Sequence, residues 1–435
     1  MDLAGALAYL ADHVDLERDP APQAAARRLD RIRRLVELMG DPQAAYPVLH
    51  LTGTNGKGST ARMLTSLLVE RGLSVGTYTS PHLQRVNERL AWNGEPISDD
   101  HLVDVIEGVA GLELLLAGRP TYFEILTAAA FRWFADIAVD VAVVEVGLGG
   151  RWDATNVASG DVAVVTNVSL DHAETIGPDL ADIAREKAGI VEPGATLVLG
   201  ETDPSLSGIF HAAGAGMVWE RDVEFGCAAN RLAHEGRLVD LWTPGARYHD
   251  LYLPVHGSFQ GENAAIALAA AEAFFGAPLA EEVVTDAMAA VRLPGRLEVV
   301  ARNPLCLLDG AHNPAGARAS SAAVAETFAG VAGRILVVGL LQGREPTEML
   351  GALGASGARL VVACPPPSPR ALPPEEVAAA AEGLGVAADV ADSVAEGVAV
   401  ALGLAAPDEL VLVSGSLYVV GAARAALTGE SLSDR

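Results

Sequence analysis

The chain has 435 residues, half of them hydrophobic, and a formal net charge of −26 from 30 basic and 56 acidic side chains. This length favours two or three domains with sizeable cores. The negative charge argues against nucleic acid as a partner, because nucleic-acid phosphates require a basic face, and against an acidic membrane surface. A small anionic ligand is compatible with it, since lysines, arginines and helix N-termini can create a locally positive site.

The sequence predicts a cytoplasmic location. No apolar run approaches the length that spans a bilayer, and the first residues carry acids where a secretory signal needs a basic start. Cys227, Cys306 and Cys364 lie far apart and form no C-x-x-C pair. We therefore expect free, mostly buried thiols rather than a zinc site or a disulfide framework.

Helix and strand patterns alternate through the first half of the chain. The stretch RRLDRIRRLVELMG is amphipathic, and Thr121 and Glu124 have the spacing of a helical capping box. The run VDVAVVEVG is apolar and β-branched throughout, which predicts a strand buried in a parallel sheet. We expect helices within 1–45 and over 60–71, 100–117, 121–137 and 179–191, strands over 47–51, 73–80, 139–147 and 161–169, and a hairpin over 89–97.

The second half predicts another α/β unit. Residues 201–250 are less regular and suggest small strands at a domain edge. After two helical stretches, LPGRLE breaks the pattern, so we place a domain boundary near Arg296. Short apolar strands then alternate with helices, which is typical of a right-handed parallel α/β sheet. The predicted helices cover 262–275 and 279–291, and the predicted strands cover 305–310, 334–340, 359–364 and 409–415.

A glycine-rich loop follows the first strand, in the stretch LHLTGTNGKGSTA. Its spacing departs from the usual phosphate-binding loop G-x-x-x-x-G-K-[ST], because Leu51 stands where the first glycine belongs and Gly58 separates Lys57 from Ser59. A tight strand-to-helix turn could need glycine for its backbone alone. Glycines and hydroxyls around one lysine at a helix N-terminus instead favour a nucleotide, whose phosphates would face the N–H groups from Gly56 onward and pair with Lys57.

Further polar residues follow the predicted strands. Glu145 ends a buried strand, and an unpaired buried carboxylate is costly, so it either accepts bonds from loop amides or ligates Mg²⁺ beside the phosphates. His172 follows Asp171 in the loop after the next strand, and is either an ordinary surface residue or part of the same metal site, although Mg²⁺ prefers oxygen ligands. Lys187 lies among other charges on a helix, where spacing alone predicts a solvated face.

The second predicted sheet also ends in polar loops. In LLDGAHNPAGA, Asp309 and His312 follow a strand. Asn313 and Pro314 are typical of a helix N-cap and of the first helical position. Ligands of open α/β sheets bind at this edge, where Asp309 could accept a hydrogen bond from a ribose hydroxyl. The motif VSGSLYVVG has the same arrangement, with polar side chains at Ser414, Ser416 and Tyr418.

Nine motifs in chain order carry a family resemblance. They are LTGTNGKGST, YTSPHLQRVNERL, TYFEILT, EVGLGGRWDATN, TNVSLDH, REKAGIV, LPGRLE, LDGAHN and SGSLY. Together they resemble the bacterial folylpolyglutamate synthase and dihydrofolate synthase family, within the Mur ligase superfamily, over nearly the whole chain. The first loop fits any Mur ligase, whereas SPHL, GLGGRxDATN and LDGAHN are more specific to the folate branch.

The resemblance implies a ligase that uses ATP to join the amine of L-glutamate to a carboxylate of a folate or of dihydropteroate. The carboxylate attacks the γ-phosphate, giving an acyl phosphate and ADP, and the amine then displaces phosphate. The implied fold class is α/β. A P-loop ATPase domain with a mostly parallel central sheet would occupy residues 1–296, and a Rossmann-like glutamate-ligase domain residues 297–435. The implied partners are these small molecules, with no nucleic acid and no membrane, and the expected state is a monomer.

The resemblance also assigns roles by position. The catalytic group would comprise Lys57, Glu145, His172 and Lys187, with Lys187 carried as a carbamate. The phosphates would be held by Gly56, Lys57, Gly58 and Ser59, and the rest of ATP by Asn263, Arg296 and Asp309. Two Mg²⁺ ions would be ligated through Ser80, Glu145 and His172. The pterin pocket would be lined by Tyr122, Phe123, Trp152, Asp153 and Ala154, and the incoming glutamate by Ser80, His312, Ser416 and Tyr418.

One stretch departs from the family pattern. Where the family usually has an Asp-Lys-Asp element, this chain reads GLLQGREPTEML, with Arg344 displaced and only Glu345 available to replace an acid. The departure raises the question of how the two domains close or how glutamate is held. Three alternatives stay open: a Mur-type ligase for a cell-wall precursor, an ATPase switch without ligase chemistry, and a binding protein that has lost catalysis. The stretch around Phe123 and Trp152 distinguishes the first of these.

Overall fold

The structure is a computed structural model that describes residues 1–15, 29–171 and 176–429. Its N-terminal part is built on an eight-stranded sheet in the order β4-β3-β2-β5-β1-β6-β7-β8. Strands β2, β5, β1, β6, β7 and β8 are parallel to one another. Strands β3 and β4 add an antiparallel hairpin beside β2, at one edge of the sheet. The bounds are β1 (Val48–Thr52), β2 (Val75–Tyr78), β3 (Leu90–Trp92), β4 (Glu95–Pro96), β5 (Val141–Glu145), β6 (Val162–Val165), β7 (Thr196–Leu199) and β8 (Met217–Glu220).

Helices cover both faces of this sheet because alternate strand residues point to opposite sides. One face packs against α4, α9 and α10, and the other against α1, α3, α5 and α6, with α7 and α8 covering the β6–β7 end. The bounds are α1 (Leu3–Ala11), α3 (Asp30–Leu38), α4 (Lys57–Glu70), α5 (Asp99–Ala110), α6 (Tyr122–Asp136), α7 (Leu180–Lys187), α8 (Pro204–His211), α9 (Phe259–Phe275) and α10 (Glu281–Ala290). Short 3₁₀ turns occupy Pro42–Ala44, Val86–Arg89, Glu113–Leu115, Ala154–Val157 and Ala188–Ile190.

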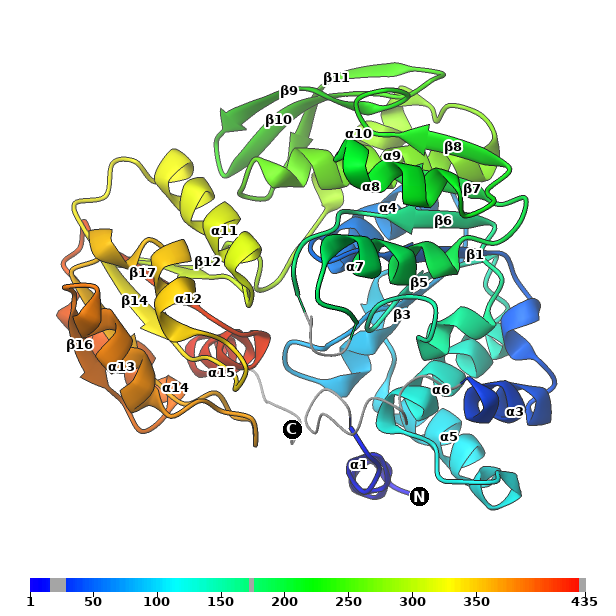
Figure 1. Cartoon of the computed structure of the whole chain (residues 1–435), viewed down its shortest axis with the longest axis horizontal. Helices are drawn as coiled ribbons and strands as arrows, with labels where there is room; N and C mark the ends of the chain where they lie inside the picture. Colours follow the sequence, from blue (N-terminus) through cyan, green and yellow to red (C-terminus); the bar gives the residue numbers. More distant parts are fainter. Residues whose placement is uncertain (16–28, 172–175, 430–435) are drawn as a thin grey trace.

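A small antiparallel sheet lies beside α9, at the top of Figure 1. Its order is β11-β10-β9, and it contributes apolar side chains to the core around α4 and α9. The sequence predicted small, irregular strands here, and the structure shows long ones, preceded by α8, which the prediction missed. The bounds are β9 (Gly226–Ala233), β10 (Gly236–Trp242) and β11 (Arg247–Leu253).

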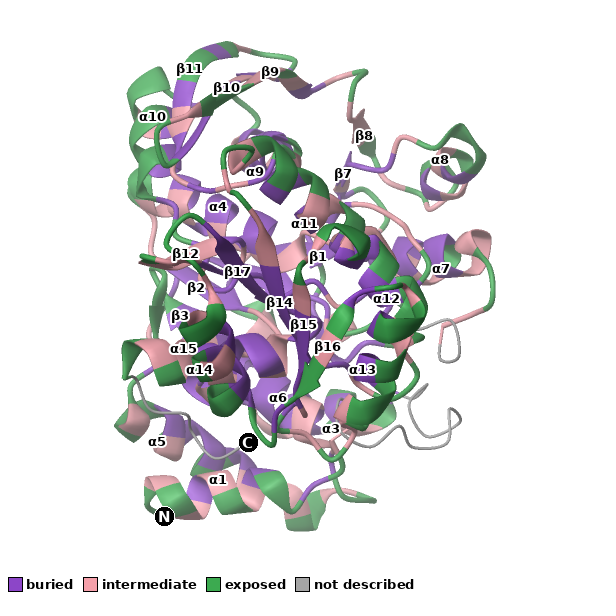
Figure 2. Cartoon of the chain, turned by 90° about the vertical axis from the view of Figure 1, so that its left-hand side faces the viewer, coloured by how far each residue is buried: buried purple, intermediate pink, exposed green. Residues whose placement is uncertain are grey.

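The C-terminal part is a six-stranded sheet in the order β12-β13-β17-β14-β15-β16, parallel except for the β12–β13 pair. Helices α11, α12 and α13 pack on one face and α14 and α15 on the other. Figure 2 shows the central strand β17 buried and the edge strand β16 largely exposed. The bounds are β12 (Glu298–Arg302), β13 (Leu305–Leu308), β14 (Arg334–Val338), β15 (Leu360–Ala363), β16 (Ala387–Val390), β17 (Leu410–Ser414), α11 (Pro314–Thr327), α12 (Pro346–Ala352), α13 (Pro374–Gly383), α14 (Val394–Leu404) and α15 (Leu417–Thr428).

The predicted α/β fold class is confirmed. The Thr121–Glu124 capping box is present at the start of α6, and Asn313 caps α11 with Pro314 at its first position. The helix predicted over 100–117 ends earlier, at Ala110, and is followed by a 3₁₀ turn. Among the described residues, no helix is long and apolar enough to span a membrane.

The thiols agree with the prediction. Cys306 and Cys364 are buried, Cys227 is half-buried, and all three are free.

Candidate functional site

The glycine-rich loop joins β1 to α4 at the carboxyl edge of the first sheet, where open α/β folds bind their ligands. Gly56 has φ 86°, in the left-handed region that favours glycine. A Cβ added to Gly56 would lie 2.5 Å from Oδ1 of Asn263 on α9, so only glycine fits between the loop and this helix. The N-terminus of α4, which begins at Lys57, therefore faces this edge with backbone N–H groups that have no acceptor within the helix.

Lys57 lies folded over its own loop. Its Nζ donates to the carbonyl oxygen of Gly53 at 3.0 Å and to that of Thr54 at 3.5 Å. These are neutral acceptors, so the described residues leave the ammonium charge without an ion pair. A phosphate would be a stronger acceptor for the same ammonium group.

Glu145 ends β5 beside this loop and is 3% exposed. Its Oε2 accepts one long hydrogen bond, 3.4 Å from the backbone N of Ser80. Burial raises the pKa of Glu145 to about 7, against the opposing charge of Lys57. A buried carboxylate with so few donors is under-satisfied, and a bound cation would compensate it.

Lys187 is 3% exposed, so the solvated face predicted from its spacing is wrong. The loop after β5 covers the end of α7: the backbone N of Arg151 donates to the carbonyl oxygen of Glu186 at 2.9 Å, and a Cβ on Gly150 would lie 3.1 Å from Cα of Lys187. Burial, reinforced by the positive charge of Lys57, lowers the pKa of Lys187 well below its ordinary value. The lower pKa favours the neutral amine, which is the nucleophilic form of the side chain.

The predicted metal ligands are only partly within the described chain. The backbone N of Ser80 lies 3.4 Å from Oε2 of Glu145, while His172 lies outside the described residues, so the metal assignment stays a prediction. Within the described ranges, no cluster of three or more histidine, cysteine, aspartate or glutamate side chains could hold a metal ion. Ser80 and Glu145 thus account for two predicted ligands, both with the oxygen atoms that Mg²⁺ prefers.

The residues predicted to line a pterin pocket divide into two groups. Tyr122 and Phe123 occupy the first turn of α6, with the Phe123 ring 5.8 Å from that of Tyr78 and the Tyr122 ring 5.4 Å from the Arg89 guanidinium. Trp152 is 41% exposed and is free to stack against a ligand.

Asp153 and Ala154 are buried instead. The Asp153 carboxylate accepts from the backbone N of Leu148 at 2.9 Å and of Thr155 at 3.0 Å, and burial raises its pKa to about 6. Asp153 therefore shapes the loop that presents Trp152.

The predicted ATP contacts from the linker and the second sheet lie next to one another. Asp309 is 5% exposed and accepts from the backbone N of Leu297 at 3.0 Å and of Ala311 at 3.2 Å. Burial raises the pKa of Asp309, and the charge of Arg296 opposes this shift. The Arg296 guanidinium donates to the carbonyl oxygen of Gly310 at 3.3 Å, and its charge partly opposes the rise that burial causes in the pKa of Glu145. Arg296 consequently brings positive charge into the region between the two sheets.

The predicted glutamate contacts follow β13 and β17. Nδ1 of His312 lies 3.0 Å from the carbonyl oxygen of Gly310. Ser416 is 2% exposed and caps α15 by accepting from the backbone N of Val419 at 3.2 Å, and Tyr418 is in the first turn of the same helix. Both loops stand at the carboxyl ends of parallel strands, facing the first sheet.

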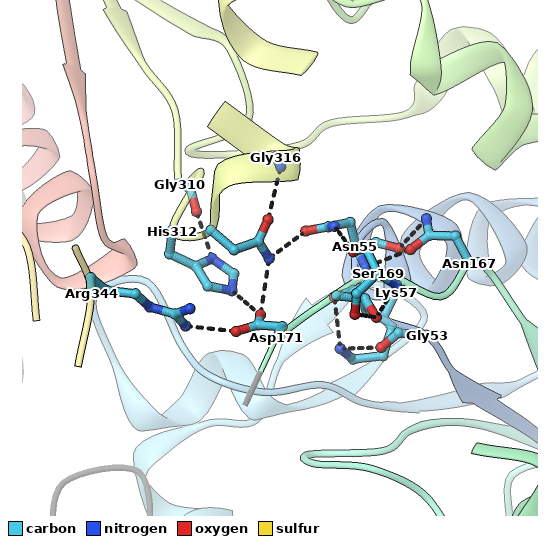
Figure 3. A network of polar contacts seen from close by, with 12 residues as sticks. Gly53, Asn55, Lys57, Asn167, Ser169, Asp171, Gly310, His312, Gly316 and Arg344 are labelled. Atoms are coloured by element: carbon cyan, nitrogen blue, oxygen red, sulfur yellow. Dashed lines mark hydrogen bonds and ion pairs between the residues drawn. The ribbon is translucent and has the colours of Figure 1, made fainter. Parts of the chain in front are cut away.

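Sequence reasoning missed the residues that join the two sheets (Figure 3). The carboxylate of Asp171 lies 2.8 Å from a guanidinium nitrogen of Arg344, 2.9 Å from Nδ2 of Asn313 and 3.6 Å from Nε2 of His312. Asn313 was predicted as a helix cap alone, and Arg344 was noted only as a departure from a family pattern. The position of Asp171 after the same strand as His172 was the available signal.

Comparisons with known proteins identify similar chains over most of the length. Residues 51–271 match the Mur ligase middle domain, and residues 295–417 match the Mur ligase glutamate ligase domain. A dihydrofolate synthase/folylpolyglutamate synthase of Mycobacterium tuberculosis is 39% identical, covering 91% of this chain and 89% of the relative. The folylpolyglutamate synthase of Lacticaseibacillus casei is 36% identical, covering 92% of this chain and 94% of the relative.

Solved structures agree with these sequence matches. The M. tuberculosis folylpolyglutamate synthase complexed with ADP has a TM-score of 0.91 at 38% identity, with 99% of each chain covered. A folylpolyglutamate synthase in a complex with AMPPCP and folate has a TM-score of 0.84 at 31% identity, covering 98% of this chain and 99% of that one.

Proposed function

Because the chain belongs to the folylpolyglutamate synthase and dihydrofolate synthase family of Mur ligases, we propose that it is an ATP-dependent ligase that adds L-glutamate to a carboxylate of a folate or of dihydropteroate. One observation carries the proposal: the under-satisfied carboxylate of Glu145 and the buried amine of Lys187 lie around Lys57. This group stands at the sheet edge that faces the second sheet. The relative solved with AMPPCP and folate supports the same substrates here.

In the first step, the phosphate loop holds ATP. The backbone N–H groups of Gly56, Gly58 and Ser59 surround the phosphates, and Lys57 leaves the Gly53 carbonyl to pair with them. The acceptor carboxylate attacks the γ-phosphorus, the bond to the β-phosphate oxygen breaks, and an acyl phosphate and ADP result. Lys57 supports this transfer by compensating the charge on the phosphoryl group.

Ser80 and Glu145 fit Mg²⁺, because both offer oxygen and the described residues give the Glu145 carboxylate no donor other than the backbone N of Ser80. When bound, Mg²⁺ neutralises phosphate charge and orients the phosphoryl group. We assign His172 as the third residue of this set, in keeping with the family, and two ions to the complete site.

Lys187 would act as a carbamate. Its neutral amine attacks CO₂, a C–N bond forms and one proton leaves, so that the lysine becomes an anion. Burial supports this, because the reaction requires the uncharged amine. The anion would hold a metal-bound water beside Glu145.

In the second step, the amine of glutamate attacks the acyl carbon and phosphate leaves. The C-terminal sheet would bring the amino acid to the phosphate loop. Residues 1–296 and 297–435 would form the two domains of the protein, which would be a cytoplasmic monomer. The nucleotide would also contact Asn263, Arg296 and Asp309. Tyr122, Phe123, Trp152, Asp153 and Ala154 would form the pterin side, and Ser80, His312, Ser416 and Tyr418 the glutamate side.

Product analysis by mass spectrometry tests the proposal. The protein is incubated with ATP, Mg²⁺ and glutamate, and with dihydropteroate, tetrahydrofolate or a UDP-sugar peptide as the acceptor. A mass increase of one glutamyl unit on either pteridine acceptor, with ADP formed in equal amount, is the expected result. ATP hydrolysis without a glutamylated product, or ligation to the UDP-sugar peptide alone, contradicts it.

A further inference from the structure

The carboxylate of Asp171, in the loop after β6 of the first sheet, is contacted by residues of the C-terminal part. Its side chain is 6% exposed, and Arg344, Asn313 and His312 lie within 4 Å of it. Asp171 follows β6, whereas all three partners follow strands of the C-terminal sheet (Figure 3). Separating the two sheets would therefore expose this carboxylate and remove these contacts together.

The contact continues from Asp171 to the phosphate loop. One hydrogen of the Asn313 amide goes to Asp171 and the other to Oδ1 of Asn55, at 3.0 Å, while the amide oxygen accepts from the backbone N of Gly316 at 2.8 Å. Asn55 in turn donates from Nδ2 to Oγ of Ser169 at 3.2 Å, two residues before Asp171. The ring Asn55–Ser169–Asp171–Asn313 thus fixes the N-terminus of α11 against the nucleotide loop.

Arg344 supplies the cation of this arrangement. It stands in the loop between β14 and α12, its side chain is 21% exposed, and one guanidinium nitrogen makes the 2.8 Å contact to Asp171. The Asp171 carboxylate is nearly buried, and removing one partner of such an ion pair leaves its charge less well compensated. His312, predicted to contact glutamate, is held on the same surface one residue before Asn313.

We infer that Asp171 and Arg344 form an interdomain clasp that positions the glutamate-binding loops over the phosphate loop. Arg344 is then a positioning residue: it acts on glutamate through the placement of His312 and the start of α11, without contact with the reacting atoms. The clasp also explains how domains can meet in a chain that lacks the family's Asp-Lys-Asp element, because Arg344 provides the positive charge from a neighbouring position. The expected effect of the clasp on the KM for glutamate rests on the proposed ligase function.

The test is a double-mutant cycle with Arg344→Gln and Asp171→Asn. Arg344→Gln is expected to raise the KM for glutamate about tenfold, with a smaller change in kcat and with the Kd for ADP within about twofold of wild type. Arg344→Lys keeps the positive charge, and the contact to Asp171 uses a single nitrogen. This variant is therefore expected to avoid most of the rise in the KM for glutamate. The double variant is expected to be no worse than the poorer single variant, because both changes remove the same contact.

A matched control is available in Arg302→Gln. Arg302, at the end of β12, also pairs across the two parts of the chain, with Glu235 in the β9–β10 turn at 2.5 Å, and both side chains are exposed. Its loss is expected to leave the KM for glutamate unchanged. Equal effects of Arg302→Gln and Arg344→Gln would overturn the clasp, since they would report loosening of any interdomain pair.

Small-angle scattering of the ligand-free protein separates failure of the clasp from failure of the proposed function. Arg344→Gln is expected to increase the radius of gyration and Arg302→Gln to leave it unchanged. An inactive wild-type protein whose radius of gyration still responds to Arg344→Gln rejects the ligase function and retains the clasp. The clasp is overturned if the effects of the two single variants add in the double variant. It is also overturned if Arg344→Gln matches wild type in both the KM for glutamate and the radius of gyration.

Discussion

Replacing Glu145 with glutamine should stabilise the metal-free protein while removing its use of Mg²⁺. Burial raises the pKa of this carboxyl from an ordinary 4.5 to about 7. Between these values the folded chain binds the proton more tightly than the unfolded chain, so wild-type stability falls as the pH rises through this window. With each pKa unit equivalent to about 1.4 kcal/mol, keeping Glu145 ionised at pH 8 costs about 3 kcal/mol.

Glutamine keeps the shape of the side chain and has no charge to bury. In EDTA at pH 8 we expect Glu145→Gln to unfold at a higher denaturant concentration than wild type, with a free energy of unfolding greater by up to about 3 kcal/mol. At pH 5 the difference should fall below about 1 kcal/mol, because the folded carboxyl is then protonated. Adding Mg²⁺ should raise the stability of wild type more than that of the variant, because binding to the folded state alone stabilises it.

Glu201→Gln provides the matched control. Glu201 is 9% exposed and accepts from the backbone N of Val168, Thr202 and Asp203 at 2.7 to 2.9 Å, so its charge is already satisfied. Its replacement should destabilise the protein by about 1–3 kcal/mol at pH 8. The reasoning is refuted if Glu145→Gln is less stable than wild type at pH 8, if the difference is independent of pH, or if ligation keeps its dependence on Mg²⁺.

Three further changes test the rest of the site. Lys57→Ala should lower ligation at least about 100-fold, by removing the charge that compensates the phosphoryl group, and near-wild-type turnover in the product assay would reject the ATP assignment. Lys187→Ala should stay folded by circular dichroism and bind ATP by calorimetry but be nearly inactive, with partial recovery in acetate; a crystal with nucleotide and metal that shows a plain amine at Lys187 would contradict the carbamate. Gly56→Ala should weaken ADP binding at least about tenfold by calorimetry, because its Cβ meets Asn263. Gly72→Ala, at φ 98° but with nothing within 4 Å, is the control for backbone strain, and equal losses would show that the contact with Asn263 is unimportant.

The sequence predicted features that depend on local pattern. Glu145 was placed correctly at the end of a buried strand, because an unbroken β-branched run is a strong signal for a parallel strand. The cap at Asn313 also follows from two adjacent residues. Strand β16 was missed because Ala387–Val390 is short and mostly exposed at a sheet edge, and so has no apolar run to detect.

Features set by distant segments could not be predicted from spacing. Lys187 is surrounded by charges along the chain, yet it is buried because the loop around Gly150 closes over the end of α7. Only the family motif predicted a functional role for Lys187. Likewise, no local pattern brings Arg344 to Asp171, because the contact depends on how two separate sheets are placed.

The phosphate loop is contacted by residues that come much later in the chain, and this has a consequence for folding during synthesis. Gly56 is packed against Asn263, and Asn55 accepts a hydrogen bond from Asn313, 258 residues further along. A nascent polypeptide that has left the ribosome only as far as β8 therefore carries the loop sequence but neither of these supports. Because a ligand stabilises only a conformation that can bind it, we expect ATP to assist folding only after α9 and α11 have emerged and supplied these contacts.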